Sequence, residues 1–196
     1  MTTLPLTAAT LPQLLSAARA ALPARAAPIA AAHWSFETLG GQRMYGWNPG
    51  ALTCKTVPGP CADNPLVTSG LTFVSFATLS DGAAGYVRYL QGKSGGVAYQ
   101  ALLTGEVASF AQALQAVGYS GDLPASGYQS GIDAWLPKLQ ALPVVPPSPL
   151  RALGWGTAAT WVAAGILGTF VGTWAAEGWD RTWPGWKSHP PRRRYA

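Results

Sequence analysis

Apolar residues recur at three- and four-residue intervals in two stretches of the chain, 81–91 and 105–117. This spacing places them on one face of a helix, as in amphipathic helices that bury that face in a protein core. The two faces consist of Ala83, Tyr86, Val87 and Leu90 in the first stretch and of Val107, Phe110, Ala111, Leu114 and Val117 in the second. We predict a helix in each stretch and assign these positions to the core.

Capping and turn residues bound the other helices that the pattern predicts. Thr10 and Ser80 are suited to cap a helix at its start, and the glycine pair Gly40 and Gly41 is suited to end one. With these signals, the expected helices cover about 11–22, 28–40, 81–91, 95–103, 105–117 and 128–141. Residues 1–141 therefore predict a domain of the α+β class that is mainly α.

Residues 42–70 are rich in Gly, Pro and Asn and contain both cysteines of the chain, Cys54 and Cys61. We predict loops and short strands here, followed by a strand over 71–76. The two cysteines enclose a Pro- and Gly-containing loop, so they form either a disulfide that stiffens it or two free thiols. A zinc site needs more ligands than this chain offers with two histidines, and we expect no metal and no cofactor.

Residues 152–176 carry no charge. As a helix they would extend about 37 Å, more than the roughly 30 Å of a bilayer's hydrocarbon core. Tryptophans lie toward both ends, as in an aromatic belt, and Gly168 and Gly172 form a GxxxG face that another helix could approach closely. We predict a transmembrane helix over 151–177, joined to the domain by a Pro-rich linker at 142–150; the alternative is a buried helix of a soluble protein.

Charge is concentrated after that segment. The chain has 13 Lys and Arg against 8 Asp and Glu, and the tail 178–196 ends in the basic run Arg192, Arg193 and Arg194. By the positive-inside rule, the tail lies in the cytoplasm and the N-terminal domain outside it, at a virion membrane or a bacterial inner membrane. The arginines either set this topology only or also contact phosphates of lipid or nucleic acid. The first residues do not resemble a secretory signal, so we expect the C-terminal segment to direct insertion.

Glu37 is the most plausible catalytic group of the domain. It lies near the end of an Ala-rich helix, among apolar and aromatic neighbours. A carboxyl group in such surroundings is poorly solvated, which favours its protonated form and allows it to donate a proton to a glycosidic oxygen. The alternative is a helix-end glutamate that points into water. The sequence contains no nucleophile-elbow, P-loop or Rossmann motif that would indicate another chemistry.

The order of motifs over roughly residues 10–140 resembles the glucosaminidase branch of the lysozyme-like superfamily, found in phage and bacterial peptidoglycan hydrolases. The matching segments are Glu37-Thr-Leu-Gly-Gly41, Tyr45-Gly-Trp-Asn48-Pro-Gly50, Phe73-Val-Ser-Phe76, Gly118-Tyr119 and Gly127-Tyr128. The chain departs from the family pattern at Leu39, which displaces a glycine, and at Ala51, which replaces a second asparagine. The resemblance implies a helical lobe with a small β-lobe.

The resemblance also implies that Glu37 is the general acid for cleaving the β-1,4 glycan backbone of peptidoglycan, by hydrolysis or by lytic transglycosylation. Tyr128 and Tyr119 match family positions near the sugar, and Asn48 matches an asparagine of the cleft; we expect Trp34 to contact the glycan as well. Asp63 is a possible second acid, because it is the one acidic residue of the β-lobe region. The function expected is that of a membrane-anchored hydrolase in a phage virion, and the alternative is an inactive lysozyme-like glycan-binding or structural module of a membrane-containing virion.

Overall fold

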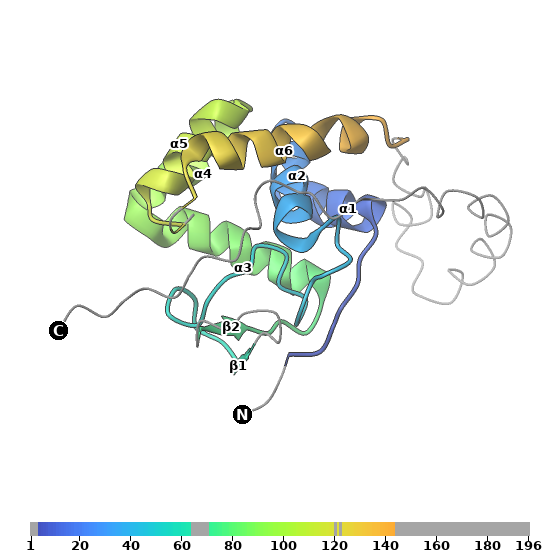
Figure 1. The fold of residues 1–196 in the computed structure, drawn as a ribbon, viewed down its shortest axis with the longest axis vertical. Coiled ribbons are helices and arrows are strands. Elements are labelled where there is room, and N and C mark those ends of the chain that lie inside the picture. The colour runs from blue at the N-terminus through green and yellow to red at the C-terminus, as the bar shows by residue number, and fades with distance from the viewer. Residues whose placement is uncertain (1–3, 64–70, 120, 122, 144–196) are drawn as a thin grey trace, which may run out of the picture. The chain divides into compact units, whose positions relative to one another are not determined.

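A computed structural model describes residues 4–63, 71–119, 121 and 123–143 of the chain. In this part, six α-helices accompany one two-stranded antiparallel sheet (Figure 1). The elements follow one another as α1 (Leu11–Ala21), α2 (Ala27–Thr38), β1 (Cys61–Asp63), β2 (Thr72–Val74), α3 (Leu79–Gly92), a 3-10 turn η1 (Lys93–Gly96), α4 (Val97–Thr104), α5 (Val107–Ala116) and α6 (Ala125–Gln140). The predicted mainly helical class with a small sheet is confirmed.

Helix α2 is the centre of the described part. All of its residues are buried except Pro28, Phe36 and Glu37, which are partly exposed. A helix buried on nearly every side lies in a protein core, and the four small alanines of α2, at 27 and 30–32, let neighbouring helices approach closely. Helix α6 packs along one side of α2 and helix α1 packs along another side, so α2 is held between them.

The six predicted helices are present, and each begins within three residues of the predicted start. Helix α3 begins before the predicted cap Ser80, because Thr78 is the capping residue: its hydroxyl accepts a hydrogen bond from the Asp81 N–H at 3.1 Å and donates to the Asp81 carboxylate at 2.7 Å. Helix α6 begins at Ala125, ahead of the predicted position 128, directly after Pro124. At α1, Thr10 is the capping residue as predicted, and its N–H donates to the Gln13 side chain at 2.8 Å.

The small sheet pairs Cys61 with Val74 and Asp63 with Thr72, and it lies at the end of the described part farthest from α6 in Figure 1. A disulfide joins Cys54 to Cys61, with 5.9 Å between their Cα atoms. Of the two states that the sequence left open for these cysteines, the structure has the disulfide, which ties the loop before β1 to the strand itself.

The N-terminal segment runs along the same region and links the helices to the sheet. The Leu4 N–H donates to the Asp63 carbonyl and the Ala9 N–H to the Gly41 carbonyl, each at 3.0 Å. Gly41 has a φ of +86°, and a Cβ there would lie 2.1 Å from the Ala9 carbonyl oxygen. Only glycine fits this close approach of two backbone segments, so the glycine pair both ends α2 and receives the N-terminal segment.

The predicted transmembrane helix over 151–177, with Gly168 and Gly172, lies outside the described residues, as do the basic tail and nearly all of the 142–150 linker. Among the helices that the structure does describe, none combines the length and the apolar character that crossing a bilayer requires.

Candidate active site

Glu37 lies in the last turn of α2, and its side chain is 16% exposed. It opens onto a small pocket of about 40 Å³, room for only a few water molecules. The other lining residues come from the N-terminal segment, the end of α2, the loop after it and β2: Leu4, Thr38, Arg43, Tyr45, Asn48, Ala51 and Phe73. Glu37 is the one carboxylate among these lining residues, and it has contact with both solvent and the protein interior.

The Glu37 carboxylate is held by a residue distant in the sequence. The Tyr128 hydroxyl, on α6, donates a hydrogen bond to Glu37 Oε1 at 2.7 Å. The Tyr128 ring is only 6% exposed and packs edge-on against Phe36, which precedes Glu37 on α2. The packing of α6 on α2 therefore sets this hydrogen bond, and it brings together two residues that the sequence assigned to one site.

One helical turn before Glu37, His33 faces the same carboxylate oxygen. Its Nε2 atom lies 3.4 Å from Glu37 Oε1, and its side chain has no exposed surface. The other ring nitrogen, Nδ1, lies 2.8 Å from the Tyr86 hydroxyl of α3. Aromatic rings enclose the imidazole from three further elements, with ring centroids 5.1–5.7 Å away; they belong to Tyr86, Phe110, Tyr119 and Tyr128.

The tyrosines of this cluster are neutral phenols at physiological pH. Burial raises the pKa of each well above its usual value, and the neighbouring negative charge of Glu37 raises it further. The largest cause is burial in every case. A neutral phenol keeps its hydroxyl hydrogen, so Tyr86, Tyr119 and Tyr128 remain hydrogen-bond donors at the site.

Asn48 lines the pocket, but the backbone uses its amide. Its Nδ2 donates to the carbonyls of Leu52 and Val74 at 2.8 and 3.0 Å, and its Oδ1 accepts from the Leu52 N–H at 2.9 Å. The side chain is 4% exposed. These bonds hold the loop before the sheet against β2, so Asn48 shapes the pocket wall that faces Glu37. Its predicted contact with substrate stays a prediction.

The remaining predicted site residues lie away from the pocket lining. Tyr119 donates to the Gly50 carbonyl and packs on His33. Trp34 has no exposed surface and packs edge-on against Tyr86, so in this structure it belongs to the core and presents no surface for a glycan. Asp63 is partly exposed on β1, where its backbone carbonyl receives Leu4, and its side chain is not among those lining the pocket.

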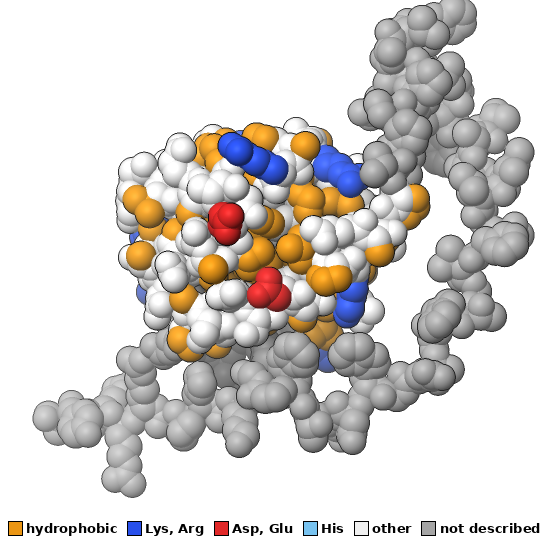
Figure 2. Space-filling model, turned by 90° about the horizontal axis from the view of Figure 1, so that it is seen from above, with side chains coloured by type: hydrophobic (Ala, Val, Ile, Leu, Met, Phe, Trp, Pro, Cys, Tyr) orange, Lys and Arg blue, Asp and Glu red, His pale blue; other side chains and the backbone are white. Residues whose placement is uncertain are grey.

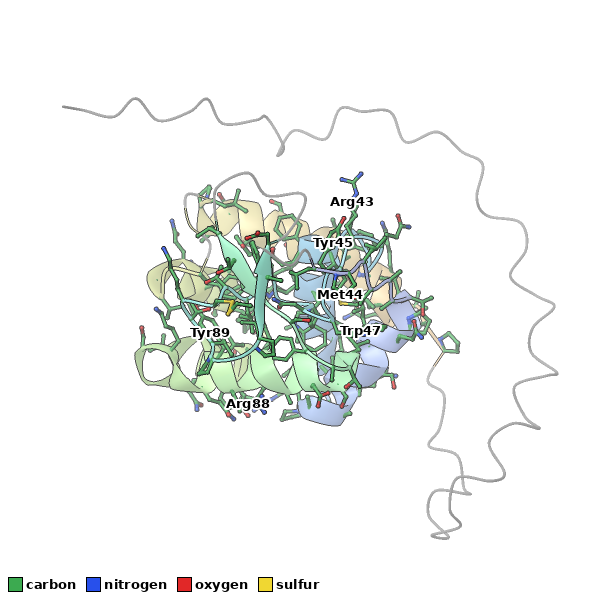
Figure 3. The ribbon with its side chains drawn as sticks, turned by 90° about the horizontal axis from the view of Figure 1, so that it is seen from below. Arg43, Met44, Tyr45, Trp47, Arg88 and Tyr89 are labelled. Carbon is green, nitrogen blue, oxygen red and sulfur yellow. A yellow bond between two sulfur atoms is a disulfide. The ribbon has the colours of Figure 1, made fainter. Side chains whose placement is uncertain are left out.

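The structure adds residues that sequence reasoning did not assign to a site. His33 enters the sequence argument only as one of two histidines too few for a zinc site, although its position four residues before Glu37 places both on one face of a helix. Arg43 and Tyr45 line the pocket from the loop after α2, and Figure 3 shows the Arg43 side chain directed outward from the molecule. In the sequence, Arg43 and Tyr45 could have been connected with the site through their position just after the glycine pair that ends α2.

The charges of the described part are scattered. On the face of the molecule shown in Figure 2, which includes α6, acidic and basic side chains stand apart among uncharged ones, with no continuous basic surface. In the part of the chain that the structure covers, no three His, Cys, Asp or Glu side chains gather as they would around a metal ion. At the pocket itself, the Glu37 carboxyl group and its Tyr128 partner can transfer a proton and form hydrogen bonds.

Comparison of the chain with family models, with curated proteins and with solved structures found no match. The resemblance to glucosaminidases thus rests on the order of the motifs in the sequence. The geometry bears on it at one point, since Glu37 and Tyr128 are hydrogen-bonded at the edge of a pocket. A carboxyl group placed in this way, partly shielded from water and open on one side, can give a proton to a bound molecule and take one back.

Proposed function

We propose that this protein cleaves the β-1,4 glycan backbone of peptidoglycan, with Glu37 as the general acid. The observation that carries the proposal is the setting of Glu37: a carboxyl group 16% exposed, hydrogen-bonded to a buried tyrosine at 2.7 Å, beside a pocket with no other carboxylate in its lining. This combination suits a group that must be protonated at the start of a reaction and ionised after it. The motif order in the sequence supplies the substrate class.

In the proposed reaction, Glu37 gives its proton to the glycosidic oxygen as the bond from that oxygen to the sugar C1 breaks. The bonding electrons stay on the oxygen, which leaves as an alcohol, and positive charge develops at C1. The Glu37 carboxylate then takes a proton from the group that attacks C1. That group is either water, which gives hydrolysis, or the C6 hydroxyl of the same sugar, which gives a 1,6-anhydro product.

The absence of Asp63 from the pocket lining favours schemes that need one carboxylate. Inverting hydrolysis requires a second carboxylate to activate water on the opposite face of the sugar. Glu37 alone can serve both halves of a transglycosylase-type closure, or of a hydrolysis assisted by the substrate's own acetamido group. The proposed residue set is thus Glu37 as acid and base, with Tyr128 as its hydrogen-bond donor.

A second candidate is a glycan-binding or structural module without activity. The observation in its favour is that the pocket lining contains no second carboxylate beside Glu37 to activate water. Both candidates include attachment to a membrane through residues 152–176, in keeping with a virion component that acts at the cell wall. They differ in whether the glycan is cut.

A digestion assay on purified peptidoglycan with the full-length protein separates the two. The comparison is between wild type, Glu37→Gln and the control Glu106→Gln, which removes a carboxylate from an exposed position at the start of α5. We expect wild type and Glu106→Gln to release soluble fragments and Glu37→Gln to be at least about 100-fold slower. Mass spectrometry of the ends then distinguishes a reducing muramic acid, a reducing glucosamine and a 1,6-anhydro sugar. A folded wild type that sediments with peptidoglycan without cutting it would establish the binding module.

A further inference from the structure

His33 is a fully buried polar side chain with one ring nitrogen left over. Nδ1 is paired with the Tyr86 hydroxyl at 2.8 Å, whereas Nε2 makes no hydrogen bond that satisfies strict geometry among the described residues. Its nearest acidic neighbour is Glu37 Oε1, at 3.4 Å. Buried polar groups without a partner are rare in proteins, because desolvation costs about 1–3 kcal/mol when no bond replaces water. An orphaned nitrogen that lies beside a proposed catalytic carboxyl group therefore calls for a role.

The surroundings determine which nitrogen carries the hydrogen. A lone pair on Nε2 would face the lone pairs of Glu37 Oε1, which is unfavourable, so the hydrogen belongs on Nε2. Nδ1 is then an acceptor, and burial keeps the Tyr86 phenol protonated so that it donates to Nδ1. The Tyr86 hydroxyl thus fixes the tautomer in which His33 presents an N–H to Glu37.

The groups that face His33 come from every element packed against it. They are Glu37 on α2 itself, Tyr86 on α3, Phe110 on α5, Tyr119 after α5, and Tyr128 on α6. Glu37 is the only carboxylate in this set, no lysine or arginine belongs to it, and the tyrosines are neutral. No other charged group in this set therefore strengthens or weakens the interaction between His33 and Glu37.

We propose that His33 is a positioning residue which, together with Tyr128, holds Glu37 Oε1 so that the transferable proton resides on Oε2. Oε1 then accepts the Tyr128 O–H at 2.7 Å, and the His33 N–H lies 3.4 Å from the same oxygen, near enough to stabilise it electrostatically. Oε1 serves as the acceptor oxygen in both protonation states, and Oε2 is left to give its proton to the glycosidic oxygen and to regain one later. No proton leaves His33 or Tyr128, so the proton balance is that of Glu37 alone. The catalytic part of this inference rests on the proposed function.

The tautomer can be measured without any activity. The full-length protein has two histidines, so ¹⁵N-histidine labelling gives two imidazole patterns, and His189→Asn assigns the one from His33. We expect the hydrogen of the His33 ring on Nε2, and the Nε2 shift to move in Glu37→Gln. We also expect Tyr86→Phe to weaken the tautomer preference, because Nδ1 loses its donor. A hydrogen on Nδ1, a doubly protonated ring, or an Nε2 signal unaffected by Glu37→Gln would overturn the inference.

Kinetics on peptidoglycan test the catalytic part. We expect Tyr86→Phe to lower kcat about tenfold or more at unchanged KM, the effect of losing one hydrogen bond to a charged group. The alkaline limb of the pH–rate profile should move to higher pH, because a donor to Oε1 stabilises the ionised form of Glu37 more than the protonated form, so its loss weakens the ionised form more. The control is Tyr89→Phe, on the same helix, whose ring packs on Tyr119. Tyr89→Phe should leave kcat and the limb unchanged.

A second pair of variants distinguishes a positioning role of His33 from a loss of folding. His33→Gln keeps an N–H donor near the Nε2 position and should retain more activity than His33→Phe, which keeps ring volume but has no donor. Equal losses in the two, in step with the folded fraction measured by circular dichroism and with no movement of the pH limb, would mean that His33 is structural only. If wild type does not cut peptidoglycan at all, the proposed function and the catalytic role fall together, and the NMR result alone decides whether His33 donates to Glu37.

Discussion

Gly131→Ala is the sharpest test of the helix packing that builds the site. Gly131 lies on α6, one turn after Tyr128, and faces Phe36 on α2. A Cβ added there would lie 2.4–2.7 Å from three atoms of the Phe36 ring, Cδ2, Cε2 and Cγ. Cγ lies on the axis about which the ring rotates, so turning the ring cannot relieve that contact. Either the Phe36 side chain changes its χ1 angle or α6 moves away from α2.

Two opposing effects set the size of the change. Alanine is the better helix former by up to about 1 kcal/mol, whereas overpacking a well-packed site costs about 1–3 kcal/mol. Because the contact involves Cγ, we place the overpacking cost at about 2–3 kcal/mol, which leaves a net loss of about 1–2 kcal/mol. For a domain of this size, that corresponds to a Tm lower by about 3–8 °C.

Gly92→Ala is the matched control. Gly92 ends α3 with φ and ψ in the right-handed helical region, it is exposed, and no atom lies within 4 Å of its added Cβ. Only helix propensity acts there, and we expect a gain of about 0.4–1 kcal/mol. Thermal and urea unfolding of both full-length variants, followed by circular dichroism, give the comparison. A Gly131→Ala protein as stable as Gly92→Ala would refute the packing described for α2 and α6.

Three further changes have expected outcomes. Reducing the disulfide should lower the free energy of unfolding by about 2 kcal/mol, the chain-entropy value for cysteines seven positions apart, and the Cys54→Ala/Cys61→Ala protein should not respond to reductant. Asn48→Ala should cost about 2–4 kcal/mol in urea unfolding, because it removes three buried hydrogen bonds to the backbone and takes away the partner of the Leu52 N–H; a loss below 1 kcal/mol would contradict those bonds. Stability should fall as pH rises above 10, the usual tyrosine value, because the folded protein retains the Tyr86, Tyr119 and Tyr128 phenol protons that the unfolded chain releases. The part of the phenolate absorbance that is missing from the three single Tyr→Phe variants belongs to these residues, and its appearance before helicity is lost would contradict their raised pKa values.

Helix positions were predictable from the sequence because apolar spacing and capping residues are local signals. The face that contains Tyr86 is buried as the spacing predicts, and so is the face that contains Phe110 except at Val107, which is partly exposed. The sequence could not tell Thr78 from Ser80 as the cap of α3, because both residues are good caps. In the structure the Thr78 hydroxyl accepts the Asp81 N–H and begins the helix. Side-chain geometry of that kind is decided by the backbone turn before the helix.

The site was predictable only in part, since it depends on contacts between distant segments. Glu37 stood out through its apolar neighbours, and Tyr128 through the family resemblance, but their hydrogen bond joins residues 91 positions apart. Nothing in the sequence links His33 to Tyr86, because the two residues belong to different helices, α2 and α3, and meet only in the folded domain. Trp34 is the opposite case: the sequence suggested a contact with the glycan, whereas the side chain is fully buried in the core.

The span between Glu37 and Tyr128 also bears on the order in which the protein assembles. Closing a loop of 91 residues is entropically costly, so contacts of this range form late unless earlier ones have drawn the ends together. Helix α2 can be packed against α1 early, but the carboxyl group on it acquires its tyrosine partner only when α6, the last described helix, docks. During synthesis the chain would therefore acquire its site as the final event of folding the domain, and an opening of α6 alone would separate the two groups while most of the core stays closed.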